Sequence, residues 1–153
     1  MNRFDEYKYF GDRALYQSQR RQNASQLFLT VNTAIFGAIA LLTRDSGLHG
    51  WVLVISIAPL FAVGVSACII WISIISRFKK IIGWYYQQLR EMENDIKGSY
   101  KFFTKEWSAF SKLDKRKVQT TFSDLETFMP MIFIGLYLIY GIGLCVSVIN
   151  KTI

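Results

Sequence analysis

Apolar residues along this chain concentrate in three long runs, with most charged residues lying between them. The runs extend over Leu27–Thr43, Trp51–Ser76 and Met129–Ile149. Across the first two runs and the gap between them, the formal charges are Arg44 and Asp45, and the third run contains none. A soluble domain would need a polar face on most of its helices. The pattern therefore predicts an all-α integral membrane protein with three transmembrane helices.

The lengths of the runs fit this prediction. The first has 17 residues and would reach about 26 Å as a helix, near the lower limit for crossing the hydrocarbon core. Pro59 inside the second run removes a backbone donor, which predicts a local kink. Pro130 falls in the first turn of the third helix, where proline is tolerated. The gap at 44–50 is only a turn, so the first two helices form a hairpin.

Lysine and arginine are distributed unequally between the ends of these spans, and this asymmetry predicts their orientation. Five of the 18 positive residues precede Leu27 and eleven lie in 77–128, whereas the hairpin turn and the C-terminal tail hold one each. The N-terminus and the long loop are therefore expected in the cytoplasm and the C-terminus outside. The predicted organisation is a cytoplasmic segment 1–26, a transmembrane hairpin 27–76, a cytoplasmic helical region 77–128, and a C-terminal span with its tail, 129–153.

The long loop has a helical pattern. Apolar residues recur at steps of three and four from Ile81 to Ile96, as in an amphipathic helix. This helix is expected to continue the second span without a break, giving a rod of about 45 residues with a rise of 1.5 Å each. Gly98 interrupts the pattern. A second short helix follows, with Tyr100, Phe103 and Trp107 on one stripe.

Three polar residues lie inside the first predicted span, namely Thr30, Asn32 and Thr33. Polarity in hydrocarbon costs free energy, so these side chains are expected to serve a purpose. One interpretation is a pore-lining or subunit-bridging ring. The other is an interhelical hydrogen bond within one protomer, which contributes about 0.6 kcal/mol. The sequence leaves both open.

Small residues occur on all three spans and permit close approach of helix backbones. The glycines of this set are Gly37, Gly64, Gly135 and Gly141. Three helices cannot bury three such faces within one protomer. A homo-oligomer is therefore expected.

The regions flanking the spans combine cations with aromatic side chains. The residues expected to contact lipid headgroups or a soluble cytoplasmic partner are Arg20, Arg21, Lys79, Lys80, Trp84, Lys105, Glu106 and Trp107. Aromatic platforms in a basic groove also bind single-stranded nucleic acid. However, positive charge beside a span is expected from topology and anionic headgroups, and seven acidic residues leave 77–128 a surplus of only four positive charges. Nucleic acid is the less favoured ligand.

No catalytic signature is evident. The chain has no Walker loop, G-x-G-x-x-G or G-x-S-x-G motif. The Arg44–His49 segment matches the Arg-x4-His pattern of a class of RNA nucleases, but it occupies an outer membrane turn. His49 is the single histidine, and Cys68 and Cys145 lie within apolar runs. We expect no enzyme activity, no metal and no cofactor.

The N-terminal third carries a family resemblance. The segments Tyr7–Phe10 and Ser18–Gln22 run into Phe28–Gly37, and this combination resembles the RipA family of small bacterial octameric membrane proteins. The cluster Lys105–Trp107 agrees with the same architecture. The resemblance implies an octameric, ring-forming assembly of the bacterial inner membrane. A looser similarity links the chain to membrane pore proteins that accompany RNA-targeting CRISPR systems.

Three functional hypotheses follow. The first is an oligomeric scaffold or pore-like protein whose cytoplasmic helices form a collar that binds partners or headgroups. The second is a membrane-anchored regulatory adaptor that recruits a soluble enzyme through the surface between Trp84 and Trp107. The third is a defence-type membrane effector that responds to nucleic acid.

Overall fold

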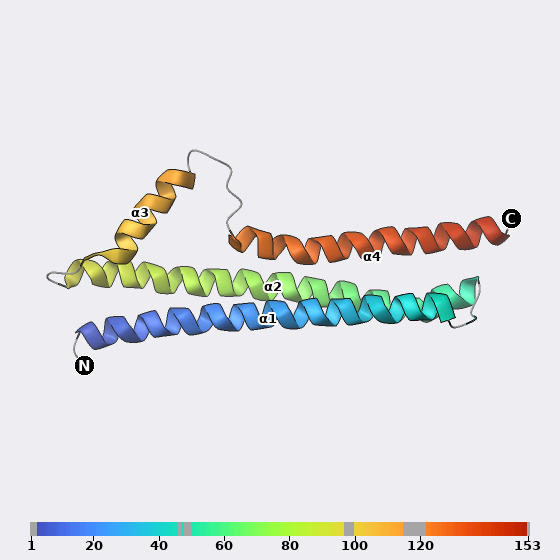
Figure 1. Ribbon diagram of the computed structural model, residues 1–153, viewed down its shortest axis with the longest axis horizontal. Coiled ribbons are helices and arrows are strands. Elements are labelled where there is room, and N and C mark those ends of the chain that lie inside the picture. The colour runs from blue at the N-terminus through green and yellow to red at the C-terminus, as the bar shows by residue number, and fades with distance from the viewer. Residues whose placement is uncertain (1–2, 46, 48–49, 97–99, 115–121, 153) are drawn as a thin grey trace. The chain divides into compact units, whose positions relative to one another are not determined.

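The computed structural model describes residues 3–45, 47, 50–96, 100–114 and 122–152, and every regular element in these ranges is an α-helix. The helices are α1 (Arg3–Asp45), α2 (Trp51–Asp95), α3 (Phe102–Asp114) and α4 (Phe122–Thr152) (Figure 1). Three of them, α1, α2 and α4, are long and apolar enough to cross a membrane. The predicted all-helical fold with three such helices is confirmed.

The helices extend beyond the apolar runs. Because α4 begins at Phe122, Pro130 lies inside this helix, and the prediction that it occupies the first turn is wrong. The 45 residues of α2 continue through the predicted boundary at Ser76, as expected for a rod. The segment before Leu27, which the sequence pattern left unassigned, belongs to α1. It is helical because Tyr7, Phe10 and Ala14 recur on one partly or fully buried face. Gly98 and His49 lie outside the described residues.

The chain packs as two compact units. One contains Met1–Asn23 and Ile75–Leu125, and we call it the charged unit. The other contains Ala24–Ile74 and Glu126–Ile153, and we call it the apolar unit. The three predicted spans lie chiefly in the apolar unit, and α3 belongs to the charged unit.

In the apolar unit, α1, α2 and α4 lie side by side (Figure 1). The buried core contains Ile39, Leu53, Ile57, Cys68 and Tyr137. Aromatic rings connect the helices: Phe28 of α1 stacks on Trp71 of α2 with centroids 6.0 Å apart. Many large apolar side chains are exposed on the surface of this unit, which suits contact with hydrocarbon rather than water.

In the charged unit, the N-terminal part of α1 packs on the C-terminal part of α2. The Phe10 ring of α1 lies 5.9 Å from Tyr85 of α2. Ile82 and Leu89 of α2 are buried in this unit. Helix α3 joins the same unit through Phe103, whose ring lies 5.6 Å from Tyr86 of α2.

Candidate functional site

A buried polar node connects the three helices of the apolar unit. Asn32 of α1 is fully buried. Its Nδ2 donates to the Phe28 carbonyl at 2.8 Å. Its Oδ1 accepts from Tyr137 Oη of α4 at 3.1 Å and from Cys68 Sγ of α2 at 3.2 Å. One amide oxygen therefore binds donors from two other helices.

The Tyr137 ring is closely packed against side chains of α1 and α2. It stacks on Phe36 with centroids 4.3 Å apart and meets the edge of Phe61 at 5.8 Å. Gly64 of α2 lies directly beneath it, where an added Cβ would be 2.8 Å from Tyr137 Cε1 and would overlap Cζ and Oη. Gly64 is needed because the ring occupies the space of its missing side chain. This glycine serves packing within the protomer.

The other small-residue positions are more open. An added Cβ would meet nothing within 4 Å at Gly37 or Gly135, and at Gly141 it would lie 3.6 Å from Phe61. Gly37 is exposed on α1. The described part of the protomer therefore gives no packing reason for glycine at Gly37 or Gly135.

Thr30 and Thr33 lie on the exposed side of α1, opposite Asn32. Their hydroxyls donate to carbonyls of their own helix, at 3.0 Å to Gln26 and 2.8 Å to Leu29. We define the outer face of α1 as Thr30, Thr33, Ala34 and Gly37. These four exposed residues include nothing larger than threonine.

The exposed side of α4 is chemically different. The exposed large apolar residues on it include Ile132, Leu136, Ile139, Ile142 and Val146. Such a surface matches lipid tails, which are as apolar as leucine. The outer face of α1 therefore differs from this surface, although exposed large apolar residues flank it on α1, namely Leu27, Leu29, Val31 and Leu41.

A second polar node organises the charged unit around Glu93 of α2. This carboxylate is 1% exposed. Its oxygens accept from the backbone N–H groups of Phe103 and Thr104 at 2.9 and 3.0 Å, and from Thr104 Oγ1 at 2.8 Å. Tyr7 Oη of α1 donates to it at 3.0 Å. Glu93 therefore caps the first turn of α3 from another helix and ties α1 to the same point.

Burial and hydrogen bonds together determine the charge states of Glu93 and Tyr7. Burial raises the pKa of Glu93, but the donors of Phe103, Thr104 and Tyr7 outweigh it, so its pKa is lowered. Burial raises the pKa of Tyr7 to about 12, and the bond to the Glu93 carboxylate and its negative charge act in the same direction. The stable form is a carboxylate facing a neutral phenol.

The predicted headgroup-contact residues all belong to the charged unit. Arg20 is exposed and lies over the Tyr16 ring, 5.8 Å from its centroid. Lys80 is exposed, whereas Arg21 and Lys79 are half-buried. Trp84 is half exposed and packs against Phe10 at 6.1 Å.

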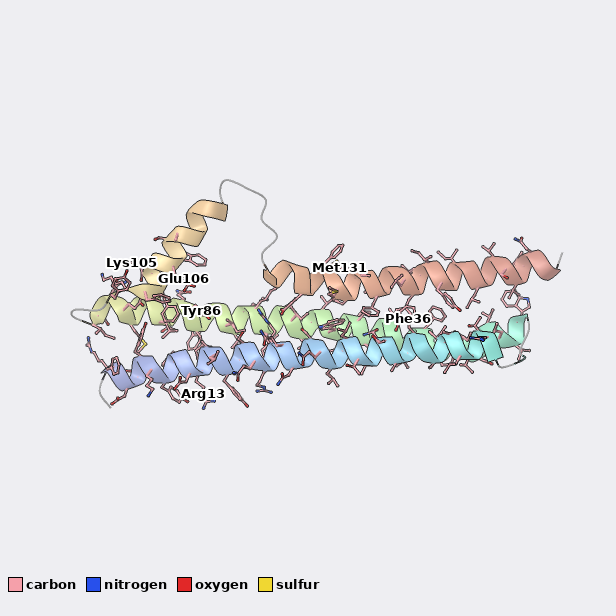
Figure 2. All side chains as sticks on the ribbon, in the orientation of Figure 1. Arg13, Phe36, Tyr86, Lys105, Glu106 and Met131 are labelled. Atoms are coloured by element: carbon pink, nitrogen blue, oxygen red, sulfur yellow. The ribbon has the colours of Figure 1, made fainter. Side chains whose placement is uncertain are left out.

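The predicted cluster at 105–107 lies on α3 (Figure 2). Lys105 Nζ lies 3.7 Å from the centroid of Tyr100. Trp107 is 59% exposed, and the guanidinium of Arg90 from α2 lies 4.5 Å from its ring centroid. Lys105 therefore engages an aromatic ring, and Trp107 receives a cation from a different helix.

The sequence pattern did not identify either buried polar node as a set of contacting residues. Glu93 looked like one more surface charge, although it falls within the stripe from Ile81 to Ile96, which was a usable signal. No feature of the sequence identified Tyr137 as the partner of Asn32, because it is one of several aromatic residues in the third apolar run. Among the described residues, no group of three or more histidine, cysteine, aspartate or glutamate side chains could hold a metal ion.

Three long apolar helices with large apolar side chains exposed on their surfaces are typical of an integral membrane protein of the helical class. A family model agrees and is more specific: the octameric membrane protein family (8xMP) matches residues 4–148. The chain belongs to this family, and the resemblance drawn from its N-terminal segments is confirmed. Comparisons with curated proteins and with solved structures returned no match.

Proposed function

We propose that eight copies form a ring in the bacterial inner membrane, with the outer face of α1 lining a pore-like passage. The observation that carries this proposal is the contrast between the outer face of α1, residues Thr30, Thr33, Ala34 and Gly37, and the exposed side of α4. The outer face of α1 is small and carries two hydroxyls, whereas the exposed side of α4 carries isoleucine, leucine and valine. Polar groups within membranes generally face protein or water. The α4 surface is suited to hydrocarbon, and the outer face of α1 to an axis or a neighbouring copy.

The burial of Asn32 refines this proposal. Its oxygen already accepts two hydrogen bonds within the protomer. The hydroxyls of Thr30 and Thr33 donate hydrogen bonds to backbone carbonyls of α1. Each hydroxyl oxygen still has lone pairs that can accept from water. The threonines, rather than Asn32, are the residues we assign to the lining.

The proposed orientation places the N-terminus and 77–128 in the cytoplasm and the C-terminus outside. Sixteen of the 18 positive residues then lie on the cytoplasmic side. Arg20 and Lys80 would contact anionic headgroups there. The charged unit would form a collar, and the role of the assembly would be non-catalytic.

Thiol labelling tests the lining. In a Cys145→Ser background, Thr33→Cys and Gly37→Cys are compared with Ile139→Cys of α4 as the matched lipid-facing control. A membrane-impermeant thiol reagent should modify the α1 positions in the assembled octamer and leave Ile139→Cys unmodified. Native Cys68 can remain because it is buried. If Thr33→Cys and Gly37→Cys were as unreactive toward the reagent as Ile139→Cys, the outer face of α1 would lie against protein or lipid and would not line a passage.

Flux measurements test the passage itself. Purified octamers in liposomes should release a small dye or ion tracer, and labelling of Thr33→Cys should block the release. The mass of the detergent-solubilised complex confirms eight copies in the same sample. Absence of flux under every voltage, pH and ionic condition, with the octamer intact, would favour the scaffold function.

An adaptor function is the second candidate, favoured by the exposure of Trp107 on α3. The Trp107 side chain is 59% exposed and belongs to the charged unit, so its indole ring is available to a soluble partner. Trp107→Ala should then abolish capture of that partner without changing the mass of the oligomer. Trp51→Ala, which alters a similarly exposed tryptophan of the apolar unit at 54%, is the matched control.

A further inference from the structure

The charged unit contains a cavity of about 350 Å³ between α2 and α3. Gly83, Tyr86 and Arg90 of α2 form one wall, and Phe103, Glu106 and Trp107 of α3 form the other. Figure 2 shows Tyr86 on α2 and Glu106 on α3. The size is at the lower end of the range for small-molecule sites, about 300–1,000 Å³. It suits a ligand with a single ring.

Two opposite charges line this cavity without pairing. Arg90 stacks on Trp107, and its N–H groups donate to no side chain or backbone group in the described part of the chain. Glu106 likewise accepts from none of the described residues, and no ion pair joins it to Arg90. Glu106 is exposed and Arg90 is half-buried, so both charged groups are accessible to a ligand, and charge-assisted hydrogen bonds to such groups are about twice as strong as neutral ones. Stacking on the indole also fixes the plane of the guanidinium, so its donor edge is preorganised.

Gly83 leaves part of the α2 wall of this cavity without a side chain. It lies inside α2, where glycine costs about 0.5–1 kcal/mol relative to alanine. An added Cβ would meet nothing within 4 Å, so packing among the described residues does not require glycine there. The glycine leaves the α2 backbone accessible to a ligand at this wall. The glycine and the two unpaired charges point to the same space.

We infer that this cavity binds a small aromatic zwitterion, of which a free aromatic amino acid is the simplest example. The carboxylate would accept from Arg90, the ammonium group would donate to Glu106, and the ring would lie between Tyr86, Phe103 and Trp107 beside Gly83. A lipid headgroup does not fit. Arg90 follows Arg77 by thirteen residues of α2, which is about 20 Å of helix, whereas the headgroup layer is only about 6 Å deep on each side.

The test uses the intact octamer in detergent and isothermal titration with three related probes. L-phenylalanine carries both charges, 3-phenylpropionate only the carboxylate, and 2-phenylethylamine only the ammonium. Phenylalanine should bind at least about tenfold more tightly than either single-charge probe, because each of those loses one charge-assisted contact. Arg90→Gln removes the contact to the carboxylate, so phenylalanine should then bind no more tightly than 2-phenylethylamine. Glu106→Gln removes the contact to the ammonium group, so phenylalanine should then bind no more tightly than 3-phenylpropionate.

Gly83→Leu separates ligand binding from folding. An added Cβ at Gly83 meets no described neighbour, and the rest of the leucine side chain would occupy space at the cavity, so the octamer should persist while phenylalanine binding is lost. Gly11→Leu is the matched control, because an added Cβ there also meets nothing, and it should bind as the parent does. Equal binding of the three probes, binding that survives Gly83→Leu, or no binding at all would overturn the inference. So would shielding of Trp107 from a soluble quencher in the free octamer, since a neighbouring copy would then fill the cavity.

Discussion

Tyr137 of α4 donates its hydroxyl proton to Asn32 Oδ1 of α1 at 3.1 Å, across 105 positions of sequence. The bond lies within hydrocarbon-spanning helices, where water cannot replace it. The bond fixes the position of α4 along the axis of α1 and the rotation of each helix about its own axis. Cys68 joins the same oxygen from α2, so one acceptor fixes the register of three helices.

Breaking this bond should weaken the apolar unit measurably. We expect Tyr137→Phe to lower the free energy of unfolding by about 0.6 kcal/mol and by no more than about 1.7 kcal/mol, the mean and the maximum found for polar contacts between membrane helices. A double-mutant cycle with Asn32→Ala, followed by unfolding in mixed detergent, isolates the pairwise energy. Additive effects of the two substitutions would show that the bond carries no coupling.

Gly64 should tolerate no side chain while Tyr137 is present. Gly64→Ala introduces a Cβ that overlaps the Tyr137 ring, and overpacking of this kind costs about 1–3 kcal/mol. Gly37→Ala is the matched control, with open space around its added Cβ, and it should be neutral or slightly stabilising. Thermal unfolding of both variants measures the difference, and Tyr137→Leu should restore much of the loss in the Gly64→Ala background.

Glu93 should make the stability of the charged unit depend on pH. Its pKa is lower in the folded protein than the ordinary value of 4.5, so folding favours the carboxylate. This contribution is complete above the ordinary value and is lost as the pH falls through the folded pKa. Glu93→Gln should cost about 1–3 kcal/mol at neutral pH, and the difference from the parent should shrink in acid. A constant difference at all pH values would exclude this origin.

Tyr7 should show the opposite dependence. Its pKa is raised to about 12 in the folded protein from an ordinary 10.0, so its contribution is present below the ordinary value. It is lost as the pH rises through the folded pKa. Tyr7→Phe should cost about 1 kcal/mol near neutral pH, with the α3 signal in hydrogen exchange as the readout.

The orientation is tested by reporters. A reporter that is active only outside the cytoplasm should be active when fused after Ile153 and inactive when fused before Arg3. The expected result follows from the positive charges of 1–26 and 77–128. Activity of the N-terminal fusion instead would invert the proposed orientation and remove the collar from the cytoplasm.

The sequence alone determined the helical class, the three spans and the unbroken α2. These features depend on local patterns: an apolar run long enough for a bilayer, and apolar residues at three- and four-residue steps. The N-terminal segments also carried the family resemblance. Such properties belong to each segment separately, so they can be read before any packing is known.

Only the tertiary structure decided which side chains meet. Asn32 was expected either to line a passage or to bridge helices, and its bonds to Cys68 and Tyr137 depend on helix rotations that no local pattern encodes. Glu93 resembled any other acidic residue until α3 placed two backbone N–H groups against it. Arg90 and Glu106 share a cavity because two helices meet there. Contacts between distant segments arise from packing geometry, and that geometry exists only in the folded chain.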